Sequence, residues 1–232
     1  MATSTVVLIT GVGRGIGRAL AKAYLSKPNH IVIGSIRDVE SPKASELKSL
    51  STASDSRLIL TGIESTSATD PHQVVKEIEA AGIDHLDIVI ANAGAFNVNA
   101  LAPIVLFQAV KPLLEKATSP KWVSVSSGAG SVALLKQYES AFVGAYGLSK
   151  AAMNWFTVAA HAGNKFLIAF AIHPGLVQSD MGNSAAKQMG LELAPNSLEE
   201  SSTKILELIE KSTRESTSGK FINVIDGTEL PW

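Results

Sequence analysis

The sequence predicts an α/β fold, a doubly wound parallel sheet of about seven strands with helices on both faces. Short apolar runs alternate with longer helix-like stretches along all 232 residues, which is typical of a parallel sheet covered on both faces. The apolar runs are nearly continuous, as expected for strands buried on both faces. We find no linker, repeat or low-complexity segment, so residues 1–232 are expected to form a single domain.

The expected strands are the short apolar runs, and the expected helices are the longer stretches between them. The strands cover residues 5–9, 30–36, 58–62, 86–91, 122–126, 166–172 and 221–224. The helices cover residues 15–27, 44–50, 71–81, 98–117, 145–162 and 197–213. Residues 175–195 are rich in Gly, Ser, Met and Ala, and we expect a long loop there, either a lid or an ordinary connection.

Composition excludes several classes of function. The formal net charge is -1, from 20 basic and 21 acidic residues, which argues against nucleic-acid binding through a basic surface. There is no cysteine, so thiol chemistry is excluded and a reducing compartment is expected. The five histidines lack ligand spacing, so we expect no metal site. No apolar run approaches membrane-spanning length, and the start of the chain reads as a strand rather than a signal peptide, which favours the cytoplasm.

A glycine-rich turn follows the first expected strand. Gly11, Gly15 and Gly17 have the spacing G-x-x-x-G-x-G. Without Cβ atoms the backbone can turn tightly and approach a pyrophosphate, which the start of the next helix would bind through its free N–H groups. The sequence Asn92-Ala93-Gly94 at the end of the fourth strand strengthens this interpretation, although alone it could be a plain turn.

Tyr146 and Lys150 stand four residues apart, so on a helix both side chains lie on one face. A nearby ammonium favours the phenolate, and we therefore expect Lys150 to lower the pKa of Tyr146. Such a pair can transfer a proton near neutral pH. Ser127 lies nineteen residues upstream and could hydrogen-bond a carbonyl oxygen, with Ser126 as the alternative.

These motifs together resemble the short-chain dehydrogenase/reductase family, and the resemblance runs from Thr10 to Ser179. It implies a Rossmann-type fold in which Ser127, Tyr146 and Lys150 are catalytic. It adds Asn99 as the residue that links the lysine to a water relay, although Asn97 or Asn99 could instead cap a helix. Within the family the chain is most similar to fungal norsolorinic acid ketoreductase-like enzymes, in segments 106–109 and 173–182 and in the ending 217–232.

The end of the second strand bears on the choice of cofactor. By the resemblance, Ile36 occupies the position where NAD-preferring enzymes carry an acid for the ribose hydroxyl. Arg37 and Arg14 would instead suit a 2′-phosphate, which favours NADP(H). The alternative is that Arg37 is a solvated charge and Asp38 binds the ribose.

The rest of the expected cofactor site also follows from the resemblance. Glu64 falls near the adenine, Pro174-Gly175 beside the nicotinamide, and Ser179 on the carboxamide. The full set is Gly11, Gly13, Arg14, Gly15, Ile16, Gly17, Arg37, Glu64, Asn92, Ala93, Gly94, Tyr146, Lys150, Pro174, Gly175, Val177 and Ser179.

The chain departs from the family pattern after Gly94. The family usually has an extra helix there, whereas here a single residue, Ala95, joins Gly94 to Phe96. We then expect one wall of the active-site cleft to be missing, which leaves the cofactor and Tyr146 more open to water. The resemblance implies assembly through this helix and the Tyr146 helix, and the shortening weakens that interface. A homodimer or homotetramer is still the expected assembly.

The sequence therefore favours an NADPH-dependent reductase of a small hydrophobic carbonyl compound, such as an aromatic polyketide ketone. Met181, Met189 and Leu191 would suit an apolar substrate, or could be ordinary packing residues. Alternatives are a nucleotide-sensing protein without chemistry, and an enzyme form disabled by the short segment. An extended-type epimerase or dehydratase ranks lower, because its glycine spacing differs and its chain is longer.

Overall fold

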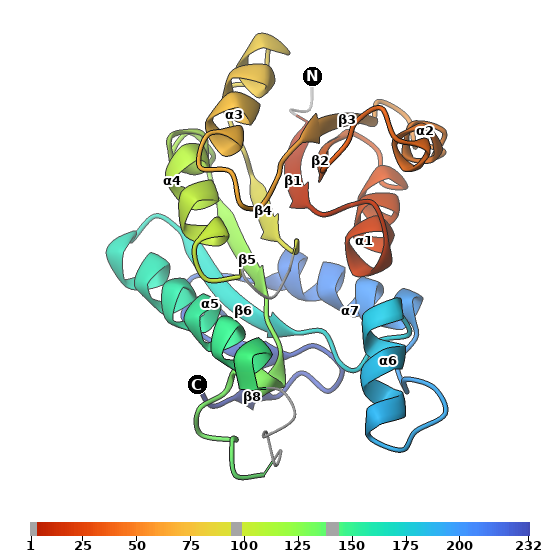
Figure 1. Ribbon diagram of the computed structural model, residues 1–232. Coiled ribbons are helices and arrows are strands. Elements are labelled where there is room, and N and C mark those ends of the chain that lie inside the picture. The colour runs from red at the N-terminus through yellow and green to blue at the C-terminus, as the bar shows by residue number, and fades with distance from the viewer. Residues whose placement is uncertain (1–3, 94–98, 138–143) are drawn as a thin grey trace.

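The computed structural model describes residues 4–93, 99–137 and 144–232. These residues form one eight-stranded sheet with the order β3-β2-β1-β4-β5-β6-β7-β8 (Figure 1). All neighbouring strands from β3 to β7 pair in parallel, and only β8 pairs antiparallel. The strand order reverses beside β1, between the halves β3-β2-β1 and β4-β5-β6-β7, and ligands of such sheets bind at this reversal. The predicted doubly wound parallel sheet is confirmed.

The strands and helices mostly lie within a few residues of the predicted bounds. The strands are β1 (Thr5–Thr10), β2 (His30–Ile36), β3 (Arg57–Gly62), β4 (Ile88–Ala91), β5 (Lys121–Val125), β6 (Ile168–His173), β7 (Phe221–Asn223) and β8 (Glu229–Leu230). The helices are α1 (Gly15–Leu25), α2 (Pro42–Lys48), α3 (Asp70–Ala80), α4 (Ala102–Leu114), α5 (Gly144–Gly163), α6 (Asp180–Gln188) and α7 (Leu198–Lys211), with a 3-10 turn η1 at Gly128–Gly130.

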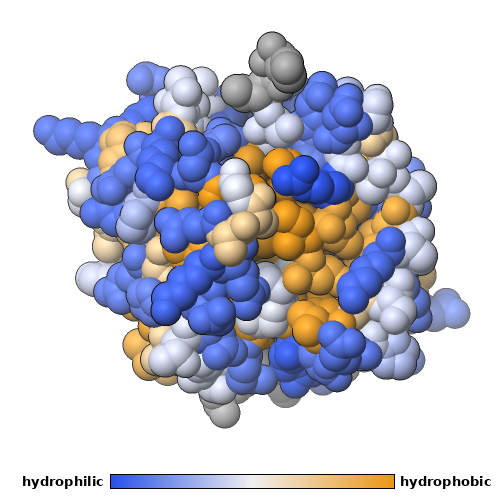
Figure 2. All heavy atoms as spheres, turned by 90° about the horizontal axis from the view of Figure 1, so that it is seen from above, coloured by the Kyte–Doolittle hydropathy of each residue, from blue (hydrophilic) through white to orange (hydrophobic). Residues whose placement is uncertain are grey.

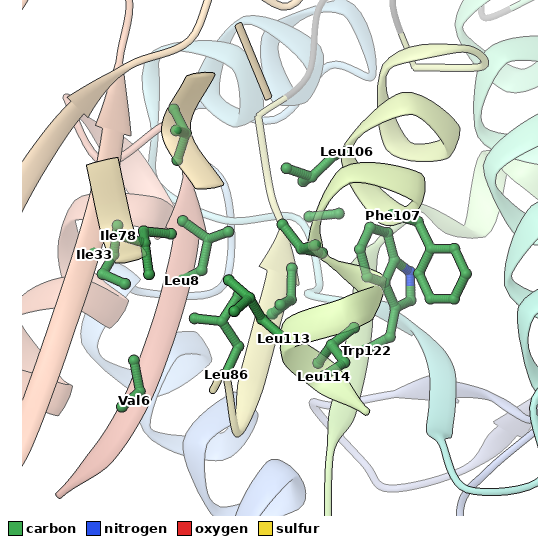
Figure 3. Packing of buried hydrophobic residues seen from close by; sticks show 14 of the residues in the cluster. Val6, Leu8, Ile33, Ile78, Leu86, Leu106, Phe107, Leu113, Leu114 and Trp122 are labelled. Carbon is green, nitrogen blue, oxygen red and sulfur yellow. The ribbon is translucent and has the colours of Figure 1, made fainter. Parts of the chain in front are cut away.

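Two layers of helices cover the sheet, because alternate strand residues point to opposite faces. Val6 and Leu8 of β1 pack toward α3, α4 and α5, whereas Val7 and Ile9 pack toward α1, α2 and α7. Figure 3 shows the first of these cores, in which Leu8 and Leu86 lie between the sheet and the helices. In the same core Trp122 makes edge contacts with Phe107 and Phe156.

The edge of the sheet at β3 is less well covered. Leu58, Ile59 and Leu60 of this strand are only half-buried. Figure 2 views the molecule from the top of Figure 1, the side on which β3, α2 and α3 lie, and shows an apolar area bordered by hydrophilic residues.

Three expectations need correction. The expected loop 175–195 contains helix α6, which Ser179 caps by accepting a hydrogen bond from the Gly182 N–H at 3.1 Å. The helix expected over 98–117 is shorter: α4 begins at Ala102, with a proline in its first turn, and ends at Leu114. Strand β8 was not predicted, because two residues show no periodicity.

Candidate active site

The glycine-rich turn connects β1 to α1 at the carboxyl edge of the sheet, with Gly11 and Gly15 at positive φ. A Cβ on Gly17 would overlap the Gly11 carbonyl oxygen and lie 2.5 Å from Asn92 Nδ2. Arg14, at the N-cap of α1, makes no side-chain capping bond to the described backbone, so the first N–H groups of α1 stay available to a ligand. The turn therefore fits a pyrophosphate, as the glycine spacing predicts.

The end of β4 is fastened to this turn. Asn92 Nδ2 donates to the Thr10 carbonyl oxygen at 2.8 Å, and the Thr10 hydroxyl accepts from the Ala93 N–H at 2.9 Å. Asn92 and Ala93 thus lie beside the turn, as expected. Gly94 and Asn97 lie outside the described residues.

The three charged residues considered for the ribose end differ in their surroundings. Arg37 is exposed at the end of β2, and its side chain has no hydrogen-bond or ion-pair partner among the described residues. Asp38 is exposed and accepts from the Glu40 N–H at 2.9 Å, which orders its own turn. Arg14 is paired with Asp180 of α6 at 3.0 Å, with both side chains exposed. Arg37 is therefore the more available cation.

A small cavity of about 30 Å³ opens where β1, β3 and β4 end. It is bordered by Thr10, Ile63, Glu64, Ala93 and, from α4, Pro103 and Leu106. Glu64 thus lies beside the strand ends that hold the glycine turn, consistent with the position expected near an adenine.

Tyr146 and Lys150 share one face of α5, as their spacing predicts. Lys150 is buried, its Nζ donates to the Val125 carbonyl oxygen at 2.8 Å, and it lies 5.9 Å from the centre of the Tyr146 ring. Burial lowers the pKa of Lys150 to about 8.

The pKa of Tyr146 shifts in the direction opposite to our expectation. Burial raises the pKa of Tyr146, and a side-chain hydrogen bond with Ser127 lowers it by a smaller amount. The expected net lowering of the pKa of Tyr146 was wrong for this arrangement, because burial raises the pKa by more than the Ser127 hydrogen bond lowers it. Tyr146 therefore holds its proton at neutral pH, which suits a proton donor.

The two serines that end β5 have different partners. Ser126 is buried, and its hydroxyl donates to Asn154 Oδ1 at 2.5 Å. Ser127 begins the η1 turn, accepts from the Ala129 N–H at 3.3 Å, and hydrogen-bonds the Tyr146 side chain. Ser127 is thus the serine that the structure brings to Tyr146, and Ser126 is a packing partner of α5.

Asn154 is a residue that the sequence reasoning missed. It lies four residues after Lys150 on the same face of α5, and its Nδ2 also donates to the Gly130 carbonyl oxygen at 3.2 Å. It therefore ties the loop after β5 to the catalytic helix. The i, i+4, i+8 spacing of Tyr146, Lys150 and Asn154 is the signal that could have revealed it.

Asn99 is buried and reaches the same helix through another missed residue, Ser149. Its Nδ2 donates to Ser149 Oγ at 3.1 Å, and Ser149 Oγ donates to the Tyr146 carbonyl oxygen at 2.7 Å. The Asn99 Oδ1 atom is buried and has no hydrogen-bond partner within the described part of the chain. A buried acceptor of this kind calls for a water or ligand donor, which fits the expected link to a water relay.

The segment after β6 turns sharply toward the glycine turn. Gly175 has a positive φ, and a Cβ there would lie 2.6 Å from Asn196 Oδ1. The Pro174 carbonyl oxygen accepts from Ser201 Oγ at 2.8 Å, and Val177 pairs with Asn196 in a short bridge. Ser179 comes within van der Waals distance of the position of a Cβ on Gly15. The segment therefore passes close to the glycine turn at Ser179, and the roles that the resemblance gives to Pro174, Gly175 and Ser179 stay predictions.

Comparison with known proteins agrees with this geometry. The family model described as short chain dehydrogenase matches residues 5–190. The chain belongs to the short-chain dehydrogenase/reductase family. It is thus an oxidoreductase of a family that uses NAD(P)H.

The proteins similar to this dehydrogenase/reductase include short-chain dehydrogenases, norsolorinic acid ketoreductases and carbonyl reductases. It is 48% identical to a short-chain dehydrogenase, srdF, of Neurospora crassa, over 99% of this chain and 98% of that protein. It is 37% identical to the norsolorinic acid ketoreductase of Aspergillus parasiticus, over 98% of this chain and 91% of that enzyme. Among solved structures, the NADPH-bound carbonyl reductase from chicken fatty liver is 25% identical, covers 100% of both chains and superimposes with a TM-score of 0.85.

The Neurospora crassa relative contains additional sequence. The alignment with the Neurospora crassa protein spans 250 positions, more than the 232 residues of this chain, so that relative contains residues that this dehydrogenase/reductase lacks.

Two further features of the described residues bear on function. No described helix is long and apolar enough to cross a membrane. Within the same residues, no group of three or more His, Asp or Glu side chains could hold a metal ion.

Proposed function

We propose that this protein is an NADPH-dependent reductase that converts a hydrophobic ketone or aldehyde to an alcohol, acting as a single domain over residues 1–232. The observation that carries the proposal is the meeting of Ser127, Tyr146 and Lys150 at the carboxyl end of β5, on the same edge of the sheet as the glycine turn. When bound, the dihydronicotinamide supplies a hydride to the carbonyl carbon.

The chain's own residues would handle the proton and the developing charge. The Tyr146 hydroxyl donates its proton to the carbonyl oxygen as negative charge develops there, and its raised pKa keeps that proton available at neutral pH. The Ser127 hydroxyl donates a hydrogen bond to the same oxygen. Lys150, protonated below about pH 8, places a positive charge near the phenol and stabilises the phenolate that proton transfer leaves.

NADP(H) rather than NAD(H) is favoured by the cations around the ribose end. Arg37 is exposed and has no ion-pair partner among the described residues, so its guanidinium is available to a 2′-phosphate. Ile36 is buried and carries no acceptor for a ribose hydroxyl. Arg14 would have to exchange its contact with Asp180 for the phosphate, an exchange between exposed partners that costs little.

The substrate class is inferred from exposed apolar side chains in and after α6, the helix whose Asp180 pairs with Arg14 of the glycine turn. Met181 and Met189 of the α6 region are 59% and 69% exposed, and Leu191 and Leu193 follow them. Flexible apolar side chains of this kind favour a multi-ring aromatic ketone over a small polar carbonyl compound. The likeness to norsolorinic acid ketoreductases supports the same class.

A homodimer or homotetramer is the proposed assembly. Leu148 and Trp155 of α5 are 73% and 72% exposed, and they stand seven residues apart, on one side of the helix. A second copy of the chain that covered this side would remove a large apolar area from water.

The test is NADPH oxidation, followed by absorbance, against multi-ring aromatic ketones, quinones and aldehydes, with NADPH binding measured in parallel by calorimetry. Turnover is the expected result. NADPH binding without turnover on any of these compounds would refute the reductase and favour a sensing protein or a disabled enzyme form. The same titration with NADH measures the cofactor preference, which should favour NADPH.

A further inference from the structure

The segment at residues 229–232 packs against the sheet in a defined way. Strand β8 pairs with β7, and Leu230 lies opposite Phe221. The Trp232 ring stacks on Phe221, with the ring centres 5.5 Å apart and the planes 18° from parallel. Because Phe221 is fully buried, Trp232 rests on a rigid part of the core.

This segment is hydrogen-bonded to the loop that follows Ser127. Ser131 Oγ donates to the Pro231 carbonyl oxygen at 2.6 Å, and the Ala133 N–H donates to the Trp232 carbonyl oxygen at 3.0 Å. Ser131 Oγ in turn accepts from the Leu134 N–H at 3.2 Å. Ser131 is buried, so the two bonds of its hydroxyl are partly shielded from water.

This hydrogen-bonded loop, residues 131–135, lies between Ser127 and Tyr146 along the chain. It follows η1, which begins directly after Ser127, and the chain continues from it to the helix that carries Tyr146. Its apolar side chains Val132 and Leu135 are 65% and 41% exposed. A polar loop tip would be the ordinary expectation for such a position, whereas exposed apolar side chains beside a catalytic serine are suited to contact an apolar substrate.

We propose, building on the function proposed above, that Trp232 is a positioning residue for substrate binding. Stacked on Phe221 and bonded to the loop through the 231–232 backbone, it fixes residues 131–135 as one wall of the substrate site. A fixed apolar wall favours broad aromatic ketones, which reach it, over single-ring aldehydes, which do not.

The experiment compares Trp232→Ala and Trp232→Phe with wild type. Calorimetry measures the Kd of phenanthrenequinone, a three-ring probe, and of benzaldehyde, a single-ring probe, on the NADP-loaded protein. For Trp232→Ala we expect the Kd of the quinone to rise about tenfold, equivalent to about 1.4 kcal/mol, while the Kd values of benzaldehyde and NADP stay unchanged. Trp232→Phe keeps an aromatic ring on Phe221 and should restore tight binding of the quinone.

Two more variants make the result specific. Ser131→Ala removes the hydroxyl that bridges Leu134 and Pro231, and it should weaken quinone binding in the same direction by a smaller factor. Phe166→Ala is the matched control, because Phe166 is also a partly exposed aromatic residue but precedes the opposite, amino end of β6. It should leave both Kd values unchanged.

Several outcomes would overturn the inference. In Trp232→Ala these are an equal rise in the Kd of the quinone and of benzaldehyde, a loss of NADP binding, or an unchanged Kd of the quinone. A wild-type protein that does not bind the quinone at all would also overturn it. Binding is measured independently of turnover. If the quinone binds but no NADPH is oxidised, the result counts against the proposed reductase, while the Kd values still test the role of Trp232.

Discussion

The cofactor side and the substrate side of this site are built in different ways. Around the glycine turn the backbone makes the shape: a Cβ on Gly17 would overlap the Gly11 carbonyl oxygen, and Gly11 and Gly15 have positive φ. Around Ser127 side chains make the shape, through Asn154, Ser131 and the Trp232 segment. The backbone-built side depends on single residues at fixed spacing, whereas the other side depends on contacts between segments far apart in the chain.

A large expected effect on kcat separates the two serines on the substrate side. Ser127→Ala should lower kcat by about 10²–10³, the usual effect of removing a donor to a developing oxyanion. Ser126→Ala should leave kcat near wild type but reduce stability, since it leaves the buried Asn154 Oδ1 without its donor. Steady-state kinetics and thermal unfolding of both variants check this. A larger loss of kcat in Ser126→Ala would reverse the assignment.

The buried Lys150 should make stability depend on pH. Burial lowers its pKa from 10.5 to about 8, so folding favours the neutral amine. Below about pH 8 Lys150 is protonated in both the folded and the unfolded state, and the buried charge destabilises the folded state. Above about pH 10.5 Lys150 is neutral in both states and this cost is absent. The free energy of unfolding of wild type, relative to Lys150→Met, should therefore rise by on the order of 3 kcal/mol across that interval.

Urea unfolding of the cofactor-free protein, at pH values below, within and above the interval, measures this difference. A flat difference, or one that falls with rising pH, would mean that Lys150 is not desolvated as its burial indicates.

On the backbone-built side, Gly17→Ala should damage both folding and cofactor binding. The new Cβ would overlap the Gly11 carbonyl oxygen, which belongs to the backbone and cannot move aside alone. We expect a loss of about 1–3 kcal/mol in unfolding free energy together with a weaker Kd for NADPH. Gly163→Ala, at the end of α5 with no atom within 4 Å of the new Cβ, is the control and should change neither.

The sequence was sufficient for most of the sheet and for the turn. Continuous apolar runs marked β1 to β7, because strands buried on both faces tolerate few polar residues. The pairing of Tyr146 with Lys150 was visible, because helical spacing is local.

The missed features have physical reasons. Helix α6 was read as a loop, because Gly182, Asn183 and Ser184 at its centre have low helix propensity. The pKa direction of Tyr146 was wrong, because it depends on burial by residues distant in sequence. The hydrogen bond from Ser131 to Pro231 joins residues 100 positions apart in the chain, and no local sequence pattern can predict such a contact.

The smallest effect concerns the cation at the ribose end. Arg37→Ala should weaken NADPH binding by about tenfold, the loss of a charge-assisted contact, and leave the Kd of NADH unchanged. Asp180→Asn is the companion variant, because it releases Arg14 and should tighten NADPH binding slightly. If the ratio of the Kd of NADH to the Kd of NADPH is unchanged in Arg37→Ala, Arg37 does not bind the 2′-phosphate, and Asp38 is the residue that binds the ribose.

The central claim is that Tyr146 donates the proton during carbonyl reduction. The most direct test measures NADPH oxidation with an accepted ketone and the Kd of NADPH, for wild type and Tyr146→Phe. The account predicts that turnover falls by about 10²–10⁴ while the Kd of NADPH stays close to wild type. Wild-type turnover in Tyr146→Phe would contradict it.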